Sequence, residues 1–180
     1  MTCSTSRTEY AVTLWVRETG SYRWNAEPSI DERLIALRNS GVIDDLVHRV
    51  WGGHIPCEDG EETYRTPTDV SVRERVRTFQ TWADSRGYSL APGFRKRERT
   101  STITDRTESI IVPPIVCLAV YDEGTLVGVY PCSNSERTIT VGDCLETFET
   151  DGTPPLYEPI AADSIDLDDS DPLLPDTPIG

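Results

Sequence analysis

Lysine is almost absent from this sequence. The single Lys96 stands beside sixteen arginines, and 31 acidic residues outnumber 17 basic ones, which gives a formal net charge of −14. An acidic excess with so little lysine is typical of proteins adapted to molar salt, where the Debye length falls to about 3 Å and surface carboxylates repel one another weakly. The alternative interpretation is a GC-rich genome, which favours arginine codons, encoding an ordinary acidic protein.

Long apolar runs are also missing. No segment approaches the ~18 continuous apolar residues of a membrane-spanning helix, and residues 2–9 are polar, unlike the start of a signal peptide. We therefore expect a soluble, cytoplasmic protein with no membrane partner.

No two cysteines have CxxC spacing. The five cysteines are Cys3, Cys57, Cys117, Cys132 and Cys144. An odd number of scattered cysteines argues against a disulfide framework, and Cys117 and Cys144 stand in apolar surroundings typical of small buried residues. The spacing excludes a redox pair of the CxxC type, in which a thiolate is the nucleophile.

Basic residues are missing from the C-terminal stretch. Residues 150–180 contain eight acidic residues, no basic residue and six of the thirteen prolines. Such a composition buries too little apolar surface to offset the entropy of ordering. We expect disordered ends at residues 1–8 and 150–180, and a single folded domain at residues 9–149.

The rest of the chain shows alternating strand and helix patterns. Apolar, β-branched and alternating runs predict strands at 10–17, 46–51, 115–121 and 126–130, with an edge strand or extended arm at 94–104. Helices are predicted to begin at Ser29, near Ser71 and at Thr140. Gly124 supplies the turn of a closing hairpin. The order βαβα, an extended piece and ββα predicts an α/β (α+β) domain, with a mixed sheet flanked by helices.

That order resembles the thioredoxin-like fold, in which a cis-proline precedes the third core strand. The resemblance implies a cis bond at Pro113 or Pro114, although a proline pair that merely separates two strands is the alternative interpretation. Thioredoxin-like enzymes carry their redox cysteine between the first strand and the first helix. Residues 17–29, RETGSYRWNAEPS, contain none, so the resemblance assigns no catalytic residue.

A second resemblance extends over residues 10–149. The blocks LWVR, HRVWGGHIP, FQTWADSRGYSLAPGF and VPPIVCLAVYDEGTLVGVYPCS are similar to a family of short haloarchaeal proteins. These proteins are often labelled helix-turn-helix (HTH) domain proteins, and the label implies DNA binding. The motif itself needs two helices joined by a turn of three or four residues. The predicted helices are separated by a strand and a long loop, so the pattern does not predict that motif.

The most unusual charge feature is the segment 71–106. It carries nine basic and four acidic residues, a local charge of +5 in an acidic chain. The densest run is Arg95, Lys96, Arg97 and Arg99, which are candidate nucleic-acid-binding residues because basic patches neutralise phosphates. The same side chains could instead pair with the protein's own carboxylates or remain solvated.

No motif in the sequence predicts a catalytic, cofactor or metal site. His54 and Cys57, with Glu58 and Asp59 beside them, lack the second ligand pair of a structural zinc site. The leading hypothesis is therefore a salt-adapted, non-enzymatic interaction module with an unidentified protein partner. The alternatives are a DNA-binding regulator that uses residues 71–106 and a degenerate thioredoxin-like enzyme.

Overall fold

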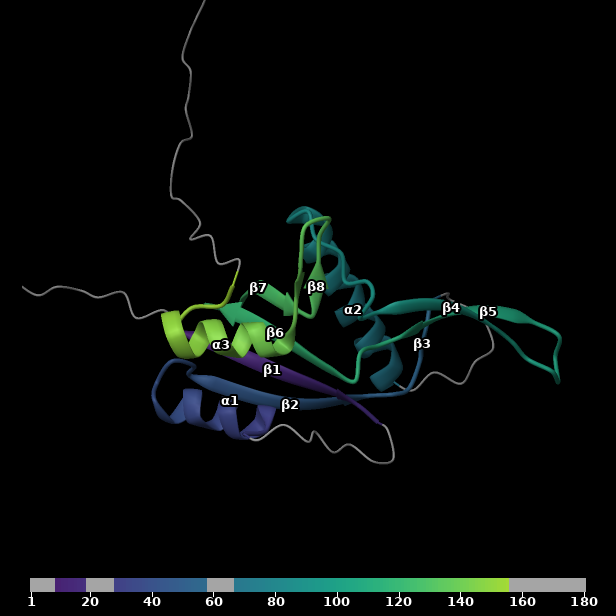
Figure 1. Cartoon of the computed structure of the whole chain (residues 1–180). Coiled ribbons are helices and arrows are strands. Elements are labelled where there is room, and N and C mark those ends of the chain that lie inside the picture. The colour runs from purple at the N-terminus through teal and green to yellow at the C-terminus, as the bar shows by residue number, and fades with distance from the viewer. Residues whose placement is uncertain (1–8, 19–27, 58–66, 156–180) are drawn as a thin grey trace, which may run out of the picture.

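A four-stranded mixed sheet forms the centre of the protein (Figure 1). The computed structural model describes residues 9–18, 28–57 and 67–155, so the expected disorder at 1–8 and 156–180 concerns residues outside those described. The strands, in sheet order, are β2 (Asp45–Trp51), β1 (Tyr10–Arg17), β6 (Val116–Asp122) and β7 (Thr125–Tyr130). β1 runs parallel to β2 and antiparallel to β6, and β7 is antiparallel to β6. The predicted mixed α and β architecture is confirmed, and its thioredoxin-like assignment stays a prediction.

Three described helices cover both faces of this sheet. They are α1 (Ile30–Asn39), α2 (Pro67–Ser85) and α3 (Val141–Asp151). On β1, Tyr10 packs edge-on against Phe148 of α3, whereas Trp15 packs edge-on against Phe79 of α2. Because side chains alternate along a strand, these two positions face opposite sides. α2 therefore covers one face, and α1 and α3 pack together on the other (Figure 1). No helix in the described ranges is long and apolar enough to cross a membrane.

Local capping signals explain two of the helix starts. Ser29 and Thr140 are N-caps of α1 and α3, and each forms a capping box with the acidic residue three positions later. The predicted start near Ser71 is wrong, since α2 begins at Pro67 and Ser71 lies inside it. Proline favours the first helical position, where its missing N–H has no partner to lose.

A second, three-stranded sheet extends from the body as an arm. Its order is β3 (Ile55–Pro56), β5 (Thr107–Val112) and β4 (Arg95–Thr100), all antiparallel. β4 confirms the predicted extended piece at the edge of a sheet. β5 was not predicted, because its apolar end runs into the proline pair and β6 without a break in hydrophobicity. A third, two-stranded sheet joins β8 (Cys132–Ser133) to β9 (Thr138–Ile139).

The predicted cis bond at Pro113 or Pro114 is wrong. The cis bonds among the described residues precede Pro92 and Pro131. The proline pair forms the connection between β5 and β6, and its two carbonyl groups accept hydrogen bonds from the side chains of Arg17 and Trp51. Those bonds hold the connection beside the sheet.

The folded part of the chain continues past the predicted boundary at residue 149. α3 runs to Asp151, Gly152 ends it in the left-handed conformation with φ of 72°, and Pro154 is buried. The sequence did not predict this extension because apolar periodicity stops at Phe148 and the following prolines resemble those of the acidic tail.

Candidate functional site

The strand β4 presents three arginines on one face of the arm. All six residues of β4 are exposed. Arg95, Arg97 and Arg99 occupy alternate positions, so their side chains share a face, while Lys96 lies on the opposite face. We call the first set the arginine face. The sequence predicted all four as nucleic-acid-binding residues, and the strand brings three of them into one row.

An aromatic stack anchors the base of the arm. Phe94, immediately before β4, is buried and packs edge-on against Trp51 with ring centroids 5.4 Å apart. Trp51 in turn stacks on Trp15 of β1 at 5.0 Å. The indole Nε1–H of Trp51 also donates to the Pro114 carbonyl at 3.2 Å. These contacts fix where β4 leaves the core and therefore where the arginine face lies.

The arginine face has little internal charge compensation. Arg95 Nε donates to the carbonyl of Pro92 at 3.3 Å, and Arg99 Nη1 lies 3.3 Å from His54 Nε2. Glu108 is the register partner of Arg99. Within the described ranges, however, no carboxylate forms an ion pair with any of the three arginines. Self-pairing with the described part of the body therefore does not neutralise this face.

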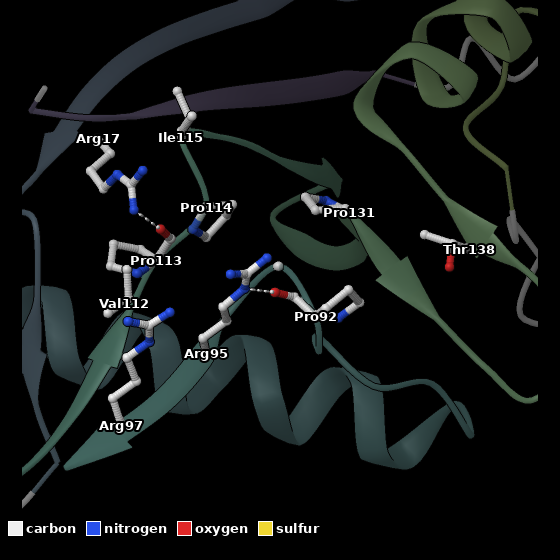
Figure 2. Close-up of a pocket in the computed structure, with 11 residues that line it drawn as sticks. Arg17, Pro92, Arg95, Arg97, Val112, Pro113, Pro114, Ile115, Pro131 and Thr138 are labelled. Carbon is white, nitrogen blue, oxygen red and sulfur yellow. Dashed lines mark hydrogen bonds between the residues drawn. The ribbon is translucent and has the colours of Figure 1, made fainter.

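A cleft of about 560 Å³ opens at the base of the arm, where Arg95 and Arg97 meet Arg17 of β1 (Figure 2). Arg17 Nη1 donates to the Pro113 carbonyl at 3.1 Å. Its Nε is buried and has no hydrogen-bond partner in the part of the chain that the structure describes. The remaining lining is Pro92, Gly93, Val112, Pro113, Pro114, Ile115, Pro131 and Thr138, without a carboxylate.

Sequence reasoning missed Arg17, which lies 54 residues before the basic segment begins at residue 71. The backbone N–H of Arg17 donates to the Ile115 carbonyl at 2.8 Å, at the end of the β1–β6 pairing. This pairing brings β1 beside the arm. No local pattern around Arg17 could have revealed the contact, because it depends on the register between distant strands.

The arginines of α2 lie apart from the arginine face. Arg75 Nη1 is 3.5 Å from the hydroxyl of Tyr121 on β6. Arg77 lines a shallow groove beside Thr125 and Leu126 of β7. The basic segment 71–106 is thus divided into two groups by the fold, and only its second half forms an arm.

The chain matches the helix-turn-helix domain family over residues 4–153. It belongs to that family. No curated protein and no solved structure matches it.

In this member of the helix-turn-helix domain family, the described helices do not form a helix-turn-helix pair. α1 and α2 are separated in the chain by β2 and β3, and six strands, β4 to β9, lie between α2 and α3. A recognition helix that follows its partner after a short turn is therefore absent from the described ranges. The densest basic run of the described structure, residues 95–99, lies on a strand rather than on a helix.

The three buried cysteines are poorly suited to nucleophilic chemistry. Burial raises the pKa of Cys117 and Cys144 well above the ordinary value, and raises that of Cys132 to about 12. These thiols stay protonated near neutral pH, and the thiolate is the reactive form. Cys57 is partly exposed. The described residues contain no group of three metal-ligating side chains, and Glu58 and Asp59 lie outside them.

Proposed function

We propose that this protein is a non-enzymatic nucleic-acid-binding regulator that contacts duplex phosphates with the arginine face of its β4–β5 arm. The observation that carries the proposal is the row of Arg95, Arg97 and Arg99 on an exposed strand, without an acidic partner in the described ranges. Membership of the helix-turn-helix domain family supports it. The proposal requires a cytoplasmic location, which stays an expectation.

The spacing of the arginine face suits a nucleic-acid backbone. Alternate residues of a strand are about 6.5–7 Å apart. Phosphates follow one another at about 3.4 Å of helix axis along each DNA strand. Neighbouring guanidinium groups of the face can therefore reach successive or alternate phosphates, and each can form the two parallel hydrogen bonds that arginine makes with phosphate oxygens.

The arm would act as a β-ribbon rather than as a recognition helix. Two-stranded ribbons fit the major groove of B-DNA, and several DNA-binding proteins use strands in this way. The anchored base at Phe94 and Trp51 keeps the ribbon at a fixed position on the body. Phosphate contacts by themselves carry no sequence information. The proposal therefore predicts affinity for duplexes in general and leaves base selectivity to other contacts.

The overall charge of −14 is the main opposing term, because a polyanion is repelled by an acidic protein. It also supports the second candidate function, an interaction module in which the same face binds an acidic protein partner. Both candidate functions use the arginine face, and they differ in the ligand, which is duplex DNA in one and an acidic protein in the other. A direct binding measurement with duplex DNA separates them.

The test is fluorescence anisotropy of a labelled duplex with the full chain, titrated at several KCl concentrations. Replacing Arg95, Arg97 and Arg99 by Gln should weaken binding and reduce the slope of log K against log salt by about 0.9 per lost phosphate contact. The matched control replaces Arg38, Arg49 and Arg86 by Gln, which removes the same charge from exposed sites outside the arm.

Equal losses in the two triple variants would show that net charge alone governs binding and would contradict the proposal. So would undetectable duplex binding by the unmodified chain at low salt. The comparison requires unchanged circular dichroism spectra of both variants. We expect both to fold like the unmodified chain, because all six substituted side chains are exposed.

A further inference from the structure

The cleft at the base of the arm contains a positive charge that no carboxylate of residues 9–18, 28–57 or 67–155 balances. Arg17 is partly buried, and its Nε is shielded from solvent without a hydrogen-bond partner. Its Nη1 donates to the Pro113 carbonyl, and among the described residues its other nitrogens have no acceptor. No carboxylate of the described residues pairs with this guanidinium. Withdrawing a cation from water without an anionic partner is costly.

Two further cations line the same cleft. Arg95 and Arg97 extend from β4 toward the Pro113–Pro114 segment, to which Arg17 is hydrogen-bonded, as Figure 2 shows. Three guanidinium groups around one cleft repel one another, and the lining provides no acidic side chain. An anion bound between them would offset the desolvation of the Arg17 guanidinium and the repulsion among the three guanidinium groups. A phosphate group matches the planar fork of guanidinium better than a spherical anion does, because it accepts paired hydrogen bonds.

The cleft is larger than a phosphate group needs. Its volume of about 560 Å³ lies within the range of sites for small organic molecules, about 300–1,000 Å³. Away from the arginines the walls are apolar, formed by prolines together with Val112 and Ile115, and Thr138 supplies the one hydroxyl of the lining. Such walls suit a flat or apolar body with few polar groups.

We propose that this cleft binds a nucleoside phosphate, with a terminal phosphate on Arg17, Arg95 and Arg97 and the nucleoside against the proline walls. This goes beyond duplex binding by the arginine face, because Arg17 lies outside the arm and because a terminal phosphate is recognised. The phosphate can belong to a free nucleotide or to the 5′ end of a nucleic-acid strand. Both present the same monoester chemistry.

The test uses isothermal titration calorimetry on the full chain with AMP, adenosine and inorganic phosphate. AMP should bind more tightly than either fragment. A second titration compares a short oligonucleotide that carries a 5′-phosphate with the same oligonucleotide that carries a 5′-hydroxyl. Preference for the phosphorylated end identifies a strand terminus as the source, whereas AMP binding without that preference identifies a free nucleotide. Either result supports the proposal.

Two variants locate the site. Arg17→Gln should weaken AMP binding at least about tenfold, since it removes charge-assisted hydrogen bonds. Arg99→Gln is the matched control, because Arg99 belongs to the arginine face but not to the cleft lining, and it should leave AMP binding unchanged. Arg17→Lys keeps the charge and loses the planar fork, so it should bind AMP more weakly than the unmodified chain even if Arg17→Gln folds poorly.

Three results would overturn the proposal. In the first, inorganic phosphate binds as tightly as AMP. In the second, both Arg17 variants still bind AMP as tightly as the unmodified chain. In the third, at millimolar ligand, AMP does not bind and the oligonucleotide with a 5′-phosphate is not preferred. None of these outcomes depends on duplex affinity, which the anisotropy titration of the unmodified chain and the two triple variants measures separately. Failure of the cleft and failure of the arginine face are therefore distinguishable.

Discussion

Arg33 of α1 and Glu149 of α3 form a bidentate ion pair between their helices, although the two residues are 116 positions apart in the chain. Arg33 Nε and Nη2 each donate to a different carboxylate oxygen of Glu149 at 2.7 Å. The pair joins the two helices that share one face of the central sheet. Parallel hydrogen bonds of this kind are more directional than a single contact between charges.

Replacing Glu149 by Gln should lower the free energy of unfolding by about 0.2–1 kcal/mol, the range for solvent-exposed pairs. The low value reflects solvent screening, since the Glu149 side chain is 41% exposed. The hydrogen bond from Arg33 lowers the pKa of Glu149 below its ordinary value. The contribution of this ion pair to stability is therefore complete above the pKa of Glu149 in the unfolded chain. It is lost as the pH falls through the pKa of Glu149 in the folded protein.

Urea unfolding of both chains at neutral and at acidic pH measures this effect. The difference between them should shrink as the pH approaches the carboxylate range. Glu136→Gln is the control, because Glu136 is an exposed acidic residue without a described ion pair. A difference that persists unchanged at acidic pH would exclude an ionic origin.

Thr140→Ala should destabilise the protein by about 1 kcal/mol, with a usual range of about 0.5–2 for N-cap residues. The Thr140 hydroxyl accepts from the Asp143 backbone N–H, and the Thr140 backbone N–H donates to the Asp143 carboxylate at 2.7 Å. That backbone hydrogen bond and a second one from the hydroxyl lower the pKa of Asp143. Thermal unfolding of Thr140→Ala should therefore show a lower midpoint at neutral pH.

The matched control is Thr147→Ala on the same helix. Its hydroxyl donates to the Asp143 carbonyl inside the helix, a bond that does not support helix formation. It should change the midpoint little. Equal effects of the two substitutions would show that the cap at Thr140 has no special role.

The end of α3 provides a third prediction, which replaces the sequence-based boundary at residue 149. A chain ending at residue 149 should be less stable than one ending at residue 155. The shorter chain loses the hydrogen bond from Gly152 N–H to the Phe148 carbonyl at 3.0 Å. It also leaves the buried hydroxyl of Tyr130 without its acceptor, the Pro155 carbonyl. An unsatisfied buried donor costs about 1–3 kcal/mol.

Guanidinium unfolding of the two truncated chains gives the comparison. Tyr130→Phe in the longer chain removes the hydroxyl instead of its acceptor and should cost less than truncation, because no buried donor is left without a partner. Coincident unfolding curves for the chains ending at 149 and 155 would contradict this prediction and support the end of the folded domain at residue 149.

Sequence reasoning succeeded where a signal and its structural consequence lie within a few residues. The caps at Ser29 and Thr140 are correct because each depends on a side chain and a backbone group three residues away. The turn at Gly124 is correct for the same reason, since its φ of 81° requires a local property of glycine. The start of α2 shows the limit, because the Ser71 spacing fits a capping box although the helix begins four residues earlier, at Pro67.

The candidate site could be predicted only in part. Arg95, Arg97 and Arg99 share a strand, so their local density was visible. The cleft was not, because Arg17 reaches it through pairing of β1 with β6. The proline pair separates β5 from β6, as one of its two interpretations predicted, without a cis bond. Its carbonyl groups are acceptors for Arg17 and Trp51, which neither interpretation predicted. Local sequence patterns contain no information about such long-range contacts.

The last prediction concerns salt, which should stabilise this protein. A net charge of −14 destabilises the compact state by self-repulsion. Raising KCl from about 0.1 M to 1 M shortens the Debye length from about 10 Å to 3 Å. The midpoint of thermal unfolding should therefore rise, most steeply at low KCl, because screening saturates. Salt also weakens ion pairs such as Arg33 with Glu149, but that loss is at most about 1 kcal/mol.

Asp44→Asn with Asp45→Asn provides the control for charge repulsion. These neighbouring carboxylates are exposed and form no ion pair with described residues. Their neutralisation should raise the midpoint at low KCl and flatten its dependence on salt. General strengthening of apolar burial by salt would instead raise the midpoint of both chains in parallel and without saturation. A midpoint that falls as KCl increases would contradict the repulsion argument, because it would show that attractive ion pairs outweigh the excess of negative charge.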